Sequence, residues 1–356
     1  MAKSTRMFEY MLPWQQANWE SFVGSFGNLH HAQIITAPEG YGLREFCLSM
    51  AQYSLCSDID KKKNTWCGVC QNCQLFSAGS HPDFHVICNE LESAQGRIDI
   101  IGEYSFRYQD ESVRDQKGPL KKIIPIDHIR ALIEKFVQRP HIATRKIALI
   151  LPADRLNINA ANALLKLLEE PPEDSLLFLL SSEPSRLPPT VLSRCVQIQL
   201  QRPSHEQVQL WLKDHTASED IDLALQLTDG APFKARQICE SGLLQIQKEL
   251  FEGLVGVCRK TASPYQLSKA LQNTDFEEVI KWLQGFVLDM VRWKNTGKSP
   301  WWSANSEQDL KPDKFSNERL FQVYDRLCVY RRIARGSINE ELALDTIFLT
   351  IQKMVR

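Results

Sequence analysis

The chain has 356 residues, a length that predicts two or three domains rather than one. Apolar residues make up 43% of it, which is enough to bury sizeable cores. Its 42 basic and 43 acidic side chains nearly cancel, which argues against a free-standing polyanion binder but not against a local basic face inside an assembly.

The first residues carry no export signal. Met1–Met11 has two early basic residues but lacks the apolar segment that a signal peptide would require. No apolar run elsewhere approaches the length needed to cross a bilayer. We therefore expect a cytoplasmic protein without a membrane partner.

A strand, a glycine-containing loop and a helix open the first domain. Residues 32–37 are predicted as a short buried strand, Pro38–Gly42 as the loop, and Leu43–Leu55 as a helix with apolar residues at helical spacing. A nucleotide-binding α/β domain begins with elements in this order.

The loop departs from a working phosphate-binding loop, which reads G-x-x-x-x-G-K-S/T. Gly40 and Gly42 permit tight backbone angles, so the loop geometry can persist. Leu43 stands where a Lys would neutralise phosphate charge, and Arg44 stands where a hydroxyl would bind Mg²⁺. Glu39 adds negative charge where phosphates would lie. Taken alone, these residues fit a plain strand-to-helix turn slightly better than a degenerate P-loop.

Four of the ten cysteines crowd into residues 56–73. Cys67, Cys70 and Cys73 follow one another at x-x spacing, close after Cys56. In a chain without an export signal, thiols at this spacing are typical of a tetrahedral Zn²⁺ site, and four Cys ligands leave no open position for catalysis. We expect a structural zinc module here, with buried free cysteines or a redox pair as the alternative.

The rest of the first 202 residues alternates between strands and helices. Further strands are predicted at residues 84–88, 146–151, 176–180 and 196–200, and helices at residues 126–138 and 158–170. This alternation predicts a doubly wound α/β domain with a parallel sheet and flanking helices. The polar stretch at about 90–118 lacks a clear period and is interpreted as an insertion, either a loop or a hairpin.

The predicted strand at residues 146–151 also lacks the acidic pair of an active ATPase. In such enzymes this strand ends in Asp-Glu, which serves Mg²⁺ and the attacking water. Here it runs into Leu151-Pro152, and Asp154 follows about one helical turn too late. We expect Asp154 to cap a helix or to form a structural salt bridge.

Two later segments carry little information by themselves. Lys166 lies on a helix that is stopped by Pro171-Pro172, which is typical of an ordinary amphipathic helix. Arg194 lies between Ser193 and Cys195, directly before an edge-like strand, and an arginine in a loop is ordinarily solvated. After Arg202-Pro203 the pattern changes to helices only.

Together, these segments resemble the AAA+ clamp-loader family over nearly the whole chain. The matching stretches are His30–Ala32, the Gly40-x-Gly42 remnant, the four-cysteine module, Ala163–Pro172 and Leu187–Cys195. The Leu-Leu-Lys-Leu-Leu-Glu-Glu-Pro-Pro and Ser-Arg-Cys sequences at this separation are highly specific to that family.

The resemblance implies an architecture and two residue roles. It implies an AAA+ α/β domain over residues 1–202, a small helical lid over residues 203–243, and a C-terminal all-α collar over residues 244–356. In this family the Ser-Arg-Cys arginine reaches ATP held by a neighbouring subunit, a role that falls on Arg194. The basic residue of the preceding helix, here Lys166, faces the inner chamber of the ring and helps couple DNA to the ATP sites.

The substitutions indicate which kind of clamp-loader subunit the chain resembles. The ATP-hydrolysing γ/τ type needs the P-loop Lys, the Asp-Glu pair and a sensor Arg, whereas this chain has Leu43, Leu151-Pro152 and Phe233 at those places. The δ type typically lacks both the cysteine module and Ser-Arg-Cys. The resemblance therefore implies a stator of the bacterial DNA polymerase III assembly, a DNA-directed DNA polymerase, with no ATPase activity of its own.

The implied function is to help the γ/τ and δ subunits load the sliding clamp on primed DNA. Zn²⁺ would be a structural cofactor, and ATP would be bound only in neighbouring subunits. Two alternatives stay open: a structural zinc-containing scaffold in which Arg194 has no catalytic role in trans, and a zinc-dependent nucleic-acid-binding module without ring partners. The near-zero net charge disfavours the second alternative.

Overall fold

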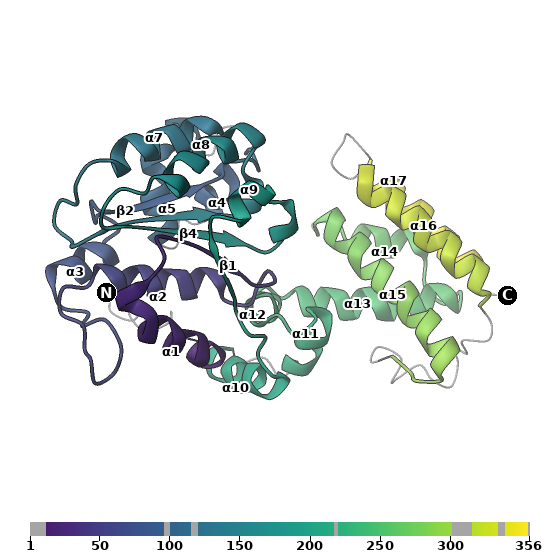
Figure 1. The fold of residues 1–356 in the computed structure, drawn as a ribbon. Coiled ribbons are helices and arrows are strands. Elements are labelled where there is room, and N and C mark those ends of the chain that lie inside the picture. Colours follow the sequence, from purple (N-terminus) through teal and green to yellow (C-terminus); the bar gives the residue numbers. More distant parts are fainter. Residues whose placement is uncertain are drawn as a thin grey trace. The chain divides into compact units, whose positions relative to one another are not determined.

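The chain forms two compact units in the computed structural model, which describes residues 12–95, 100–114, 120–216, 220–272, 274–300, 315–333 and 339–354 (Figure 1). The first unit comprises Met1–Ala217 and Leu227–Ala235, and the second comprises Ser218–Gln226 and Arg236–Arg356. The division into three domains at residues 202 and 243 stays a prediction.

A five-stranded parallel sheet forms the centre of the first unit. Its strand order is β2-β3-β4-β1-β5, with bounds β1 Ala32–Thr36, β2 Phe84–Cys88, β3 Lys146–Leu151, β4 Ser175–Ser181 and β5 Val196–Gln199. Parallel pairing aligns Ile34 of β1 with Leu179 of β4 on one side and with Gln197 of β5 on the other. The predicted parallel α/β sheet is confirmed, and β5 is an edge strand as expected.

Helices cover both faces of this sheet, because the side chains of each strand alternate between the two (Figure 1). Ile35 belongs to the core beneath α1 (Gln16–Ser25), α2 (Leu43–Leu55) and α3 (Gln71–Ser77). Ile34 belongs to the opposite core, beneath α7 (Ile126–Phe136), α8 (Ile158–Glu169) and α9 (Pro189–Leu192).

The interpretation of residues 90–118 as a loop or hairpin is wrong for the described part of that stretch. It forms three short helices, α4 Glu90–Gln95, α5 Ile100–Ser105 and α6 Glu111–Arg114. Tyr104 is fully buried, and its hydroxyl donates hydrogen bonds to the carbonyls of Leu75 and Phe76 at 3.2 and 3.1 Å. Helices of four to six residues are too short to show a helical period, which explains the error. Residues 96–99 and 115–119 lie outside the described residues.

The remaining elements are all helical, as predicted. Three short helices come first, α10 His205–His215, α11 Ile221–Leu227 and α12 Pro232–Glu240. The helices that follow contribute to a separate apolar core: α13 Leu243–Cys258, α14 Pro264–Ala270, α15 Phe276–Thr296, α16 Asn317–Ile333 and α17 Glu340–Met354. Within the described ranges, none of the helices combines the length and the apolar character that a membrane span needs.

Candidate functional site

The glycine loop joins β1 to α2 in the conformation that its glycines allow. Gly40 and Gly42 have φ values of 87° and 85°, a region that side chains with a Cβ rarely adopt. Gly42 is the N-cap residue of α2, so Leu43 begins the helix. Leu43 packs against the core beneath α1, α2 and α3. The Arg44 guanidinium forms an ion pair with Glu92 of α4.

The chain's own side chains fill the space beside this loop. The Gln15 amide donates a hydrogen bond of 2.7 Å to the Gly42 carbonyl, and the side chain is only 2% exposed. A Cβ on Gly42 would overlap the side chain of buried Leu12 and would lie 3.3 Å from the Phe233 ring. Side chains of the same chain are therefore packed over the loop.

The N-terminus of α12 also packs against the glycine loop. The Phe233 backbone N–H donates a 3.1 Å hydrogen bond to the Gly40 carbonyl. The Lys234 ammonium lies 2.8 Å from the Glu39 carboxylate, and a Cβ on Gly40 would come within 2.9 Å of the Lys234 stem. The sequence placed Phe233 at the sensor position, but it gave no sign that Phe233 and Lys234 contact the loop.

The end of β3 carries no acidic pair, and Asp154 has a structural role. Leu151 is buried at the last position of the strand. The Asp154 side chain is 2% exposed, accepts a 2.7 Å hydrogen bond from the Ser181 hydroxyl and lies 3.6 Å from the Arg155 guanidinium. The expectation of a structural role for Asp154 is confirmed.

The four predicted cysteines come together in the first unit. Cys56 caps the end of α2, Cys70 precedes α3, Cys73 lies within α3, and Cys67 lies in the loop between the two helices. All four sulfur atoms lie within 4.8 Å of one another, and none of them forms a disulfide.

The sulfur positions fit a tetrahedral metal ion. The Sγ atom of Cys56 lies 3.6 Å from that of Cys67 and 3.9 Å from that of Cys70. A tetrahedron with metal–sulfur bonds of about 2.3 Å has edges of about 3.8 Å. The cluster could therefore hold a metal such as zinc without rearrangement of the backbone. His81 is engaged elsewhere, since its ring contacts the Asn72 amide oxygen at 3.3 Å.

Arg194 lies in the loop between α9 and the edge strand β5, and its side chain is 36% exposed. One terminal nitrogen donates to the Thr190 carbonyl at 2.9 Å. The other lies 2.7 Å from the carboxylate of Glu169, the last residue of α8. The two sequence segments most specific to the clamp-loader resemblance thus meet in one ion pair, a contact that sequence reasoning missed.

Lys166 lies on the same helix, three residues before Glu169. Its side chain is exposed, and it forms no ion pair with any residue that the structure describes. Lys166 therefore places a positive charge on the exposed surface of α8. The structure brings Lys166, Glu169 and Arg194 to one region, whereas the cysteine cluster lies at the far end of α2.

The fold and the altered loop define the class of protein. A parallel sheet of order β2-β3-β4-β1-β5, a glycine loop after β1 and a helical C-terminal unit are those of a P-loop-type AAA+ chain. A solved structure from Thermotoga maritima, a DNA polymerase III γ subunit-related protein, has the same fold. It matches with a TM-score of 0.51 at 17% identity and covers 95% of this chain and 99% of its own.

Sequence comparisons identify the family within that class. The family described as "DNA polymerase III, delta subunit" matches residues 15–204, and its C-terminal counterpart matches residues 241–353. DNA polymerase III subunit delta′ of Pseudomonas aeruginosa is 31% identical over 80% of this chain and 78% of its own length. That of Escherichia coli is 28% identical over 96% and 95%. The chain belongs to the DNA polymerase III subunit delta′ family.

Proposed function

We propose that this chain is a stator subunit of the replicative clamp loader in the cytoplasm, and that it supplies an arginine in trans to a neighbouring ATP site. It would help γ/τ and δ subunits load the sliding clamp on primed DNA. The observation that carries the proposal is Arg194, which sits on a loop beside the edge strand with its guanidinium partly exposed. A side chain in that position can reach across a subunit boundary.

An arginine suits this task for chemical reasons. Its guanidinium stays protonated and offers several N–H donors in a fixed plane, which match the oxygens of a phosphoryl group. Stabilising the charge that develops on that group in the transition state is what an arginine finger does. In the described structure the Arg194 donors are engaged by a carbonyl, a hydroxyl and one half-exposed carboxylate, all at the surface.

The altered glycine loop supports the view that the chain has no ATPase activity of its own. An ATPase stabilises the charge on the transferring phosphoryl group with a Lys and with Mg²⁺. In this chain Leu43 occupies the position of the Lys, and no acidic pair follows β3 to bind Mg²⁺. The packing of Leu12, Gln15 and Phe233 around the loop also leaves little room for phosphates against its backbone.

The cysteine cluster supports a structural Zn²⁺. Four thiolates satisfy the coordination demand of the ion, so the site would be closed to substrate. The ion would tie the end of α2 to the start of α3, because ligands come from both helices and from the loop between them. Lys166 has a lesser proposed role, as an exposed charge on α8 that helps couple DNA to the ATP sites.

The test of the proposal is reconstitution of a complex from this chain, γ/τ and δ subunits, with ATPase and clamp loading measured for Arg194→Ala. Removal of an arginine finger costs about 10³–10⁵ in rate at the site it serves. Total ATPase should fall only in part, because the other sites of the ring keep their own arginines. Clamp loading should fall further if the sites act together.

Controls separate catalysis from assembly. Arg186→Ala removes another exposed arginine, which pairs with Glu183, and should leave both activities unchanged. Gel filtration should show an intact complex for both variants, and the chain alone should show no Mg²⁺-dependent turnover. Wild-type clamp loading by an intact Arg194→Ala complex would leave the scaffold function as the better account.

A further inference from the structure

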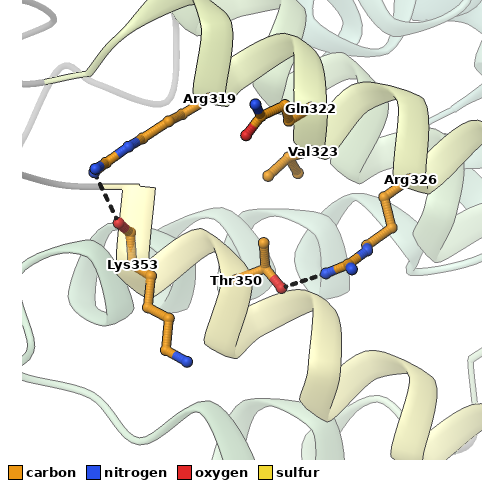
Figure 2. A pocket seen from close by; sticks show the side chains of 6 residues that line it. All are labelled: Arg319, Gln322, Val323, Arg326, Thr350 and Lys353. Carbon is orange, nitrogen blue, oxygen red and sulfur yellow. Dashed lines mark hydrogen bonds between the residues drawn. The ribbon is translucent and has the colours of Figure 1, made fainter.

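The second unit contains a hollow of about 500 Å³ between α16 and α17 (Figure 2). Its lining is polar and basic and consists of Arg319, Gln322, Val323, Arg326, Thr350 and Lys353. The hollow is remote in sequence from Arg194 and from the cysteine cluster, and the proposed function makes no use of it.

Two arginines dominate this hollow. Arg319 and Arg326 are seven residues apart on α16, which places them on one face of the helix two turns apart, about 10.5 Å along its axis. Figure 2 shows both side chains reaching from α16 toward α17. Arg319 donates a 3.2 Å hydrogen bond to the Lys353 carbonyl, and Arg326 donates one of 3.2 Å to the Thr350 hydroxyl.

The positive charge of the hollow has no carboxylate among the residues that line it. Both arginines bond to neutral oxygens, and each keeps further N–H donors in its fork. Two other cations of the same unit do face carboxylates: Lys281 lies 3.0 Å from Glu278, and Arg292 lies 3.7 Å from Asp289. The hollow is therefore a concentrated site of positive charge on a chain whose net charge is only −1.

We propose that this hollow binds the phosphate groups of a nucleic-acid backbone. Guanidinium groups bind phosphate oxygens through paired, charge-assisted hydrogen bonds. The spacing of Arg319 and Arg326 suits two phosphates along a strand rather than one isolated anion. The apolar lining residue, Val323, is 3% exposed, so an acidic peptide would find no accessible apolar anchor here. Contacts of this kind position a strand without reading its sequence.

The test uses the full chain alone and a fluorescein-labelled oligothymidine, with binding followed by fluorescence anisotropy between about 50 and 200 mM salt. The variant is Arg319→Gln/Arg326→Gln. Each phosphate contact on a single strand contributes about 0.7 to the slope of log K against log salt, so the slope should fall by about 1.4. No ATP and no partner subunit are needed, so the result is independent of the proposed role of Arg194.

A matched control removes the same charge elsewhere in the unit. Lys281→Gln/Arg292→Gln takes away two cations that already face carboxylates, and it should leave the salt slope unchanged. Lys353→Gln serves as a second variant. The Lys353 side chain forms no hydrogen bond with described residues, so its replacement should not disturb the fold. The slope of log K against log salt should fall by about 0.7 for this variant.

Several outcomes would overturn the site. They are absence of oligothymidine binding by the wild-type chain at the lowest salt, an equal loss of slope in the control variant, and an unchanged slope in both hollow variants. The hollow variants could instead bind inorganic phosphate or polyglutamate more weakly than the wild-type chain while binding oligothymidine equally well. That result would assign the hollow to a free oxyanion or an acidic peptide and refute the nucleic-acid proposal.

Discussion

Among single residues, the ion pair between Arg194 and Glu169 matters most for the proposed function. The Arg194 side chain is 36% exposed and that of Glu169 is 50% exposed, so solvent screens their attraction. Ion pairs of this kind contribute about 0.2–1 kcal/mol to stability. Under the proposed function, the guanidinium would therefore exchange Glu169 for a phosphate at small cost.

A double-mutant cycle measures that cost directly. Arg194→Gln and Glu169→Gln, alone and together, should give a coupling energy of about 0.2–1 kcal/mol in urea unfolding, decreasing at high salt. Glu170→Gln, an exposed carboxylate next in sequence, should show no coupling to Arg194. A coupling energy above about 2 kcal/mol would show that Glu169 holds the Arg194 side chain in place, which would contradict a role in which Arg194 leaves Glu169 for a phosphate.

At the scale of elements, strand β2 carries a buried histidine that makes the first unit sensitive to acid. His85 is 5% exposed, and its Nδ1 atom lies 2.6 Å from the Tyr108 hydroxyl. Burial, reinforced by the positive charges of Lys146 and Arg107, lowers the pKa of His85 from 6.5 to about 3. The ring is therefore neutral in the folded protein at neutral pH.

This shift predicts a pH dependence with a definite sign. Because the folded pKa lies below the unfolded one, the contribution to stability is complete above pH 6.5 and is lost as the pH falls toward about 3. From pH 7 to pH 5 the wild-type first unit should lose about 2 kcal/mol more unfolding free energy than His85→Gln. Exposed His205→Gln should keep the wild-type dependence. Parallel pH profiles for wild type and His85→Gln would contradict the assignment.

Elements differed in how well the sequence predicted them. The strands of residues 84–88 and 146–151 were predicted to the residue, because continuous apolar runs between polar segments mark buried strands. Helices α4 to α6 were missed, since their short length hides a helical period. In the site, the cysteine cluster was predictable because its spacing is local. The packing of Leu12 and Phe233 on the glycine loop was not, because it joins segments distant in the chain.

For the whole molecule, the two units have separate apolar cores, and the cysteine cluster belongs to the first unit only. A structural metal stabilises the unit that folds around it. We therefore expect about one zinc ion per chain, and chelation should lower the unfolding transition of the first unit while leaving that of the second in place.

Metal analysis of protein purified without added zinc, with calorimetry before and after chelation, checks this expectation. Cys70→Ser should reduce bound zinc, whereas Cys239→Ser, which changes a cysteine outside the cluster, should not. A metal-free, fully folded protein with four reactive thiols would contradict the zinc site.

The packed-over glycine loop also bears on how such a chain can evolve. Admitting a nucleotide against the loop backbone would require displacing Leu12, Gln15 and Phe233, and an ATPase site would also require the Lys and the acidic pair. Each change made alone loses packing or buries an unpartnered polar group, and none gains a ligand in return. Selection acting one substitution at a time meets a loss at every first step. The packed loop would therefore oppose a stepwise gain of ATPase activity, in keeping with the function proposed for the chain.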